Sequence, residues 1–296
     1  MKKSSFRSII GCLLLAGLSQ PSAAAKIVRD VTFATVDAST LKLDLYLPDS
    51  GPSLGLIIWV HGGAWKGGSR AGVEIKDLTS RGWAIASVDY RLSTVARFPA
   101  QIHDIKAAIR FLRAHSSDYG YPTAPFIMSG PSAGGHLAAL AGVSNDLPAL
   151  EGSVGENTAT SSSVQAIVSL YGASNLTTIL AQSTPHGIAM RVPALELLLG
   201  GQPTDLPELA RLASPVFQVG ANDPPLLLLH GDQDPQMPIN QSHELQGAYE
   251  ALDLPVVFKV MHGSAHGGPA FSSPETLDFI DTFLRKYLLT EKTPGP

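Results

Sequence analysis

The chain has 296 residues, of which 44% are hydrophobic and 16% charged, and its formal net charge at pH 7 is −4. This composition supplies a sizeable apolar core and excludes a chain that is disordered throughout. The mild acidity and the absence of any basic run argue against nucleic acid as a partner.

The first 25 residues have the pattern of an export signal. Cations precede an apolar stretch and small residues suited to cleavage follow it, in the order Lys2, Lys3 and Arg7, then Ile9 to Leu18, then Ala23, Ala24 and Ala25. The apolar stretch is too short to span a bilayer, which argues against a membrane anchor. We therefore expect a signal peptide over residues 1–25 and a periplasmic or secreted protein with no membrane anchor after its removal.

The only cysteine, Cys12, lies inside this leader. A lipidated cysteine would lie at the end of the apolar region, whereas here that region continues beyond Cys12. Removal of the leader would leave no cysteine, so we expect no disulfide, no thiolate ligand and no cysteine nucleophile.

The residues after the leader alternate in the manner of β-strands over Ile27–Val36 and Leu41–Leu47, which predicts an antiparallel pair. Further along, six short apolar runs are typical of strands buried on both faces. They are Leu56–Val60, Ala84–Val88, Phe126–Ser129, Ala166–Leu170, Leu226–Leu229 and Val256–Met261.

Segments with helical spacing lie between these runs. The clearest follows Pro99 and has apolar residues on one face, at Ile102, Ile105, Ile109 and Leu112. A final helix is expected to begin with Ser273 as its cap and Pro274 in its first turn. Alternating strands and helices predict an α/β fold, with a mostly parallel central sheet, antiparallel N-terminal strands and helices on both faces.

Residues 172–225 interrupt this alternation. They are rich in proline and contain a short helical pattern, Ala194–Leu199. Long connections in compact domains are often functional, so we expect a small helical, lid-like insertion over the active edge of the sheet, within one domain covering residues 26–296. The alternative is a surface excursion that does not contact the substrate.

The pattern Gly-x-Ser-x-Gly occurs twice, around Ser53 and around Ser132. In serine hydrolases this pattern forms a sharp turn from a strand into a helix that presents the serine hydroxyl. The copy at Ser132 follows a predicted strand and precedes strong helix formers, whereas the copy at Ser53 lies in a turn before a strand. Ser132 is therefore the candidate nucleophile, and Ser53 a turn residue.

A serine hydroxyl needs a histidine to accept its proton and a carboxylate to orient that histidine. The loops after the last two predicted strands supply two candidates of each kind, Asp232 and Asp234, then His262 and His266. We favour Asp234, because Asp232 is well placed for turn hydrogen bonding. We favour His266, which lies among glycines, over His262, which adjoins the strand. Both alternatives remain open at this stage.

His262 and His266 also have the His-x-x-x-His spacing of a zinc pair on a helix. Three glycines in or directly after this segment, Gly263, Gly267 and Gly268, disfavour a helix, and no third ligand is evident. We therefore expect neither a metal nor another cofactor.

The segment His61-Gly62-Gly63-Ala64-Trp65 follows a predicted strand. Backbone N–H groups of Gly62, Gly63 and Ala133 are candidate donors to the oxyanion of a tetrahedral intermediate. Trp65 is the candidate substrate-binding side chain, with a place in the core as the alternative.

Two cations lie close to this segment, Lys66 and Arg70. Each either attracts a carboxylate-bearing substrate or is an ordinary surface cation.

Seven segments together resemble α/β-hydrolase carboxylesterases, nearest the bacterial branch of feruloyl and acetylxylan esterases related to hormone-sensitive lipases. They are HGGAW (61–65), DYRLS (89–93), FPAQIHDIKAAIRFLR (98–113), GPSAGGHLA (130–138), LYG (170–172), HGDQDPQMPINQS (230–242) and GSAHGG (263–268). The resemblance covers nearly all of the chain after the leader. It implies Ser132 as nucleophile, Asp234 as acid, His266 as base, and oxyanion donors at Gly62, Gly63 and Ala133. Pro131 departs from many relatives, but it removes no catalytic group.

The expected function is an exported serine carboxylesterase that forms an acyl-enzyme on Ser132. Its expected substrates are small-molecule or polysaccharide-linked esters, including acetyl or feruloyl esters of plant polysaccharide and short-chain acyl esters. One alternative is a serine peptidase of the prolyl-oligopeptidase type, which would ordinarily carry a large additional domain. The other is a non-catalytic binding protein on a hydrolase scaffold, which would usually lack part of the triad or an oxyanion glycine.

Overall fold

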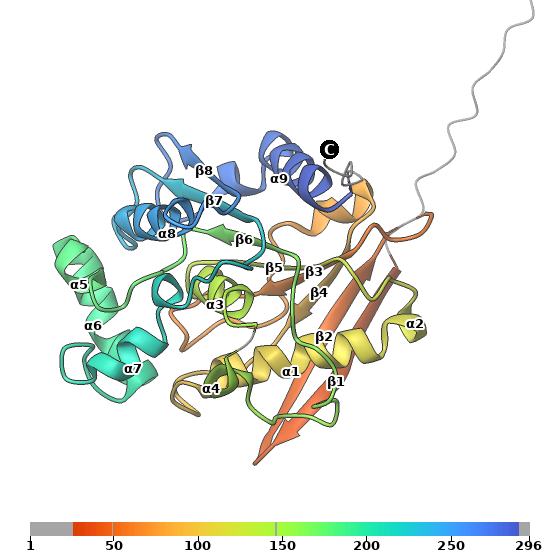
Figure 1. Cartoon of the computed structure of the whole chain (residues 1–296), viewed down its shortest axis with the longest axis horizontal. Coiled ribbons are helices and arrows are strands. Elements are labelled where there is room, and N and C mark those ends of the chain that lie inside the picture. The colour runs from red at the N-terminus through yellow and green to blue at the C-terminus, as the bar shows by residue number, and fades with distance from the viewer. Residues whose placement is uncertain (1–25, 49, 146, 290–296) are drawn as a thin grey trace, which may run out of the picture.

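The computed structural model describes residues 26–48, 50–145 and 147–289, and the signal peptide expected over residues 1–25 lies outside the described residues (Figure 1). One sheet has the strand order β1-β2-β4-β3-β5-β6-β7-β8. Its strands are β1 (Lys26–Val36), β2 (Ser39–Leu47), β3 (Leu56–Val60), β4 (Ala84–Val88), β5 (Phe126–Pro131), β6 (Ala166–Leu170), β7 (Leu226–Gly231) and β8 (Val256–Met261).

The sheet is antiparallel at one end and parallel through the rest. Strands β1, β2 and β4 pair antiparallel in that order, and all pairs from β4 through to β8 are parallel. The predicted mostly parallel sheet with antiparallel N-terminal strands is therefore confirmed. The prediction that Val256–Met261 is buried on both faces was wrong, because β8 is an edge strand and most of its residues are only half-buried.

Helices cover both faces of the sheet (Figure 1). They are α1 (Ala100–Ala114), α2 (Ser116–Tyr119), α3 (Ala133–Gly142), α4 (Pro148–Glu151), α5 (Ile179–Gln182), α6 (Pro185–Leu199), α7 (Pro207–Leu212), α8 (Asn240–Glu250) and α9 (Pro274–Leu288), with 3-10 turns η1 (Lys76–Arg81), η2 (Pro215–Phe217) and η3 (Pro269–Ser272). Buried contacts place α1, α3 and α8 on one face of the sheet, and α9 with η1 on the other.

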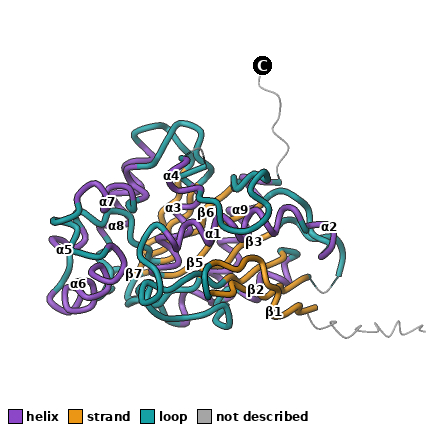
Figure 2. The backbone as a smooth tube through the Cα atoms, turned by 90° about the horizontal axis from the view of Figure 1, so that it is seen from below, coloured by secondary structure: helices purple, strands orange, loops and turns teal. Residues whose placement is uncertain are grey.

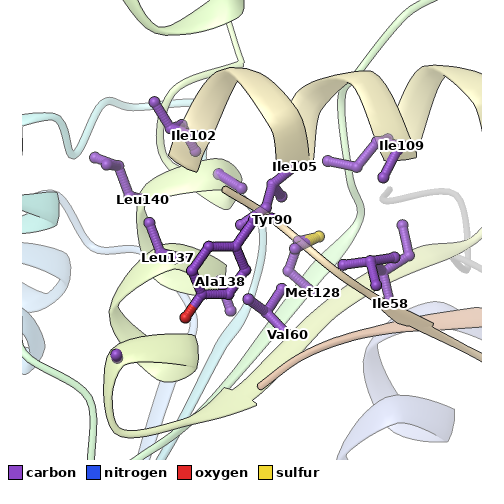
Figure 3. Packing of buried hydrophobic residues seen from close by; sticks show 14 of the residues in the cluster. Ile58, Val60, Tyr90, Ile102, Ile105, Ile109, Met128, Leu137, Ala138 and Leu140 are labelled. Carbon is purple, nitrogen blue, oxygen red and sulfur yellow. The ribbon is translucent and has the colours of Figure 1, made fainter. Parts of the chain in front are cut away.

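Helix α1 shows how the apolar pattern builds the core. The four residues of its predicted apolar face are fully buried, and they belong to the same buried cluster as Ile58 of β3, Met128 of β5 and Leu137 of α3 (Figure 3). Burying a side chain of this size stabilises the fold by about 1.5–3 kcal/mol. This packing fixes α3, and with it the turn that carries Ser132, against the sheet.

Helix α9 begins as the sequence predicts. The hydroxyl oxygen of Ser273 accepts a hydrogen bond from the N–H of Thr276 at 3.3 Å, and Pro274 occupies the first turn. Its apolar side chains Leu277, Ile280 and Leu284 pack on the second face of the sheet.

The insertion between β6 and β7 contains α5, α6, α7 and η2. Figures 1 and 2 both place α5, α6 and α7 together, at the opposite end of the molecule from β1 and β2. The predicted fragment Ala194–Leu199 is only the second half of α6, because the helix continues through Pro193. Hydrogen bonds fasten the insertion to the rest of the fold. Thr184 Oγ1 donates to Pro235 O at 2.7 Å, and the N–H groups of Ser174 and Asn175 donate to Gln241 Oε1.

Among the helices of the described residues, none combines the length and apolar character needed to cross a bilayer.

Candidate active site

The turn between β5 and α3 holds Ser132 in a backbone conformation that residues other than glycine rarely adopt, with φ 54° and ψ −119°. Two backbone hydrogen bonds secure it, from Ser132 N to Leu170 O at 2.8 Å and from His136 N to Ser132 O at 3.0 Å. The flanking glycines are sterically required. A Cβ on Gly134 would lie 1.9 Å from the carbonyl oxygen of Val60, at the end of β3.

The hydroxyl of Ser132 is joined to two other polar side chains. Ser132 Oγ lies 2.9 Å from His266 Nε2, and His266 Nδ1 lies 2.6 Å from Asp234 Oδ2. A carboxylate only accepts hydrogen bonds, so Nδ1 carries the proton and Nε2 is left free to accept the proton of the serine. The structure thus brings together the three residues that the sequence favours, from loops that follow β5, β7 and β8.

The side chain of Asp234 is fully buried, and both of its carboxylate oxygens accept hydrogen bonds. Its Oδ1 accepts hydrogen bonds from the N–H groups of Gln236 at 2.8 Å and Met237 at 2.9 Å. Burial raises the pKa of Asp234, but the hydrogen bonds from His230 and His266 and from the N–H of Met237 outweigh it and hold the pKa well below its usual range. The carboxylate is therefore ionised and fixed in orientation beside His266.

A second pair has the same chemistry but lies at the surface. His262 Nδ1 is 2.8 Å from Asp232 Oδ2, and the His262 side chain is 83% exposed. Asp232 also accepts a hydrogen bond from the N–H of Gly263, which is the turn role expected for it. The hydrogen bond of Ser132 goes to His266, so this second pair is separate from the serine.

The two histidines of the His-x-x-x-His spacing bind different carboxylates. Within the part of the chain that the structure describes, no cluster of three or more His, Cys, Asp or Glu side chains could hold a metal ion.

The backbone N–H groups of Gly62, Gly63 and Ala133 make no hydrogen bond to any residue that the structure describes. Gly62 adjoins the nucleophile, since a Cβ placed on it would lie 3.5 Å from Ser132 Cβ. Gly63 has φ 108°, and a Cβ there would lie 2.3 Å from Gly67 O, so this position also requires glycine. These N–H groups near Ser132 are therefore free to donate to an oxyanion.

The prediction that Trp65 binds substrate was wrong. Its backbone is in the left-handed region, with φ 59°, and its indole is completely buried instead of lining the cavity at Ser132. There its Nε1 donates a hydrogen bond to Nδ1 of His136 at 3.1 Å, and His136 Nε2 donates to Ala213 O at 2.7 Å. Trp65 thus joins the glycine loop to α3 from the core side.

Ser132 and His266 open into a cavity of about 680 Å³. Besides these two residues, the side chains and glycines that line it include Gly62, Gly63, Lys66, Glu74, Tyr171, Met190, Arg191 and Gln236. Met190 and Arg191 belong to α6, so the insertion forms part of the wall of this cavity.

Sequence reasoning missed three residues at this site. The ring of Tyr171 packs edge-on against His266 with centroids 4.8 Å apart, and His230 Nε2 lies 3.4 Å from Asp234 Oδ2. Both directly follow a predicted strand, and this position is the signal that could have identified them. Arg191 lies within a helix of the insertion and had no such signal.

Of the two cations near the glycine loop, Arg70 is fully engaged, because it forms ion pairs with Asp30, Asp44 and Asp89. Lys66 is exposed at the edge of the cavity.

The parallel sheet, with Ser132 in the turn after β5, Asp234 after β7 and His266 after β8, defines an α/β-hydrolase. The chain belongs to the BD-FAE family, whose model matches residues 43–249.

Several known proteins that are similar to this chain are named as esterases. Esterase LipC of Mycobacterium tuberculosis is 35% identical over 217 residues, which are 72% of this chain and 52% of that protein. A truncated carbohydrate esterase from gut microbiota has a TM-score of 0.82 at 29% identity and covers 90% of this chain and 98% of its own. Thermogutta terrifontis esterase 2 phosphonylated by sarin has a TM-score of 0.72 at 26% identity and covers 93% of this chain and 99% of its own. The chain spans about half the length of the curated relatives it matches.

Protonation of His136 is expected to destabilise the fold at acidic pH. Burial lowers the pKa of His136 to about 4, and its Nδ1 already accepts the Trp65 N–H, so the folded state resists a proton that the unfolded chain accepts near pH 6.5. The contribution of neutral His136 to the free energy of unfolding is fully present above pH 6.5. It is lost as the pH falls towards 4, by about 1.4 kcal/mol per pH unit. Urea unfolding of the wild type and His136→Gln should show a shallower pH dependence in the variant over this window. Parallel curves would contradict the assignment.

Proposed function

We propose that this protein is a serine carboxylesterase that hydrolyses carboxylic esters through an acyl-enzyme on Ser132. The observation that carries the proposal is the continuous pair of hydrogen bonds from Ser132 to His266 and from His266 to the buried Asp234. The esterase names of the similar proteins support it. The reaction needs no group beyond this chain, an ester and water.

In the acylation step, Ser132 Oγ attacks the carbonyl carbon of the ester while His266 Nε2 accepts its proton. Negative charge develops on the carbonyl oxygen, and the free N–H groups of Gly62, Gly63 and Ala133 stabilise it. Asp234, held ionised, stabilises the imidazolium. As the tetrahedral intermediate collapses, the bond to the alcohol oxygen breaks, and the imidazolium donates its proton to that oxygen.

In the deacylation step, water takes the place of the alcohol. His266 accepts a proton from the water as it attacks the acyl carbon, and the same donors stabilise the second oxyanion. The proton then returns to Ser132 Oγ, which releases the carboxylic acid and restores the free enzyme.

The proposed substrates are acetyl or feruloyl esters of plant polysaccharide, or other short-chain acyl esters. The carbohydrate esterase among the similar structures supports an oxygen-rich alcohol. The polar lining of the cavity, which includes Lys66, Glu74 and Gln236, also suits an alcohol with several hydroxyl groups.

Covalent labelling tests the nucleophile. An organophosphonate probe should add one phosphonyl group to the wild type and none to Ser132→Ala, read by intact-protein mass spectrometry. Ser53→Ala is the matched control, because Ser53 has the same flanking pattern but its hydroxyl donates to Gly55 O in a turn. Ser53→Ala should label like the wild type, and equal labelling of Ser132→Ala would defeat the proposal.

The same variants separate the alternative functions. Turnover of short p-nitrophenyl esters that Ser132→Ala abolishes supports the esterase. Cleavage of peptide anilides in preference to esters would instead favour the serine peptidase, and labelling without turnover of either would favour a binding protein.

The two Asp–His pairs offer a matched test of the acid. Asp234→Asn leaves an amide beside His266 that can donate to Nδ1, which favours the wrong tautomer for proton transfer. We expect kcat for p-nitrophenyl acetate to fall on the order of 10³- to 10⁴-fold. Asp232→Asn removes the exposed pair and should change kcat less than about twofold. Comparable losses in both variants would show that the assignment to Asp234 is mistaken.

We also propose that the protein is exported and acts in the periplasm or outside the cell, on the strength of the leader pattern in residues 1–25. Expression of the full chain in a bacterium should yield protein beginning at Lys26 outside the cytoplasm, measured by fractionation and mass spectrometry. A chain lacking residues 1–25 should stay in the cytoplasm. Recovery of the uncleaved chain in the cytoplasm would refute export.

A further inference from the structure

The cavity at Ser132 contains a buried cation that the proposed reaction does not use. Arg191 of α6 lines the cavity and is only 1% exposed. Its Nε donates to Gln236 O at 3.4 Å, and its Nη1 has no hydrogen-bond partner among the described residues. A guanidinium has five N–H donors in a planar fork that matches a carboxylate, so a partner is missing from this site.

We propose that Arg191 binds a carboxylate of the substrate, so that the enzyme selects esters that carry a negative charge over neutral esters of the same size. This inference rests on the proposed esterase function and adds the substrate class. The carboxylate is part of the substrate in addition to the ester group that Ser132 attacks.

The charge of Arg191 is not neutralised by a direct ion pair within the described residues. Burial lowers the pKa of Arg191, and the negative charge of Asp234 opposes that shift. The oxygens of Asp234, however, are occupied by His266 and by the N–H groups of Gln236 and Met237. A guanidinium keeps its proton in proteins, so the charge stays and a substrate carboxylate would supply the missing counter-ion.

The other cations near the cavity are less suited to this role. Arg70 is held by three aspartates, and the charge of the exposed Lys66 is screened by solvent and salt. Glu74 also lines the cavity, where it accepts a hydrogen bond from Tyr171. Because it is itself a carboxylate, it disfavours a substrate carboxylate next to it. The favourable place for the substrate carboxylate is therefore the α6 wall.

Arg191 also contacts the loop that carries Asp234, through Gln236 O. If Arg191 had only a structural role, its substitution would disturb the orientation of Asp234. It would then lower kcat for all esters to the same extent. A role in binding would change the discrimination between charged and neutral esters, mainly through KM.

The experiment uses two matched pairs of esters. In the first pair, the charge is on the acyl group: the mono-4-nitrophenyl ester of adipic acid is the charged member, and its methyl ester is the neutral member. In the second pair, the charge is on the alcohol: 4-acetoxybenzoate is the charged member, and 4-acetoxybenzamide is the neutral member. We expect the wild type to favour the charged member of at least one pair by tenfold or more in kcat/KM. Arg191→Gln should reduce that ratio at least tenfold with less than a threefold change for the neutral member, and Arg191→Lys should retain part of it.

Arg211→Gln is the control, since Arg211 lies in the same insertion but stacks on Phe217 outside the cavity. It should leave the ratio unchanged. An unchanged ratio in Arg191→Gln, or an equal fall in kcat for both members of a pair, overturns the inference while leaving the esterase proposal intact. Failure of the wild type to hydrolyse even the neutral esters overturns both.

Discussion

The contact between the turn at Ser132 and the end of β3 is the constraint on which the site depends. Gly134 lies so close to the carbonyl of Val60 that a single added carbon would meet it at 1.9 Å. The same strand end leads directly into Gly62 and Gly63. One close approach of two backbones therefore places the nucleophile and the free N–H donors side by side, and neither can shift without the other.

Buried hydrogen bonds hold this arrangement from the core side. Trp65 and His136 join the glycine loop to α3, and His136 also donates a hydrogen bond to Ala213, which directly follows α7 in the insertion. At the surface, Thr184 of the insertion donates to Pro235 in the loop that follows Asp234. The bonds of Trp65 and His136 are buried, and this network resists displacement because each broken bond would leave a polar group unpaired. The insertion thus supports both ends of the site in addition to forming a wall of its cavity.

Much of this was predictable from the sequence, because parallel strands are marked by short apolar runs and their carboxyl ends meet at one edge of the sheet. That rule located Ser132 and the two loops that hold the other members. It failed where tertiary context decides. Trp65 has a left-handed backbone and its side chain lies in the core. Helix α6 begins before Pro193, at Pro185, and its N-terminal part places Arg191 at the cavity. No local pattern records either event.

The two Asp–His pairs mark the boundary of what a sequence can resolve. Asp232 with His262 and Asp234 with His266 have the same residue types, nearly the same spacing along the chain, at 30 and 32 residues, and similar hydrogen bonds of 2.8 and 2.6 Å. They differ in burial, since the side chain of Asp234 is completely covered while that of His262 is almost fully exposed. Burial removes competing water, and two backbone N–H groups then fix the Asp234 carboxylate in one orientation. The two pairs have the same residue types, so the surrounding fold makes one a surface ion pair and the other an oriented acid–base pair.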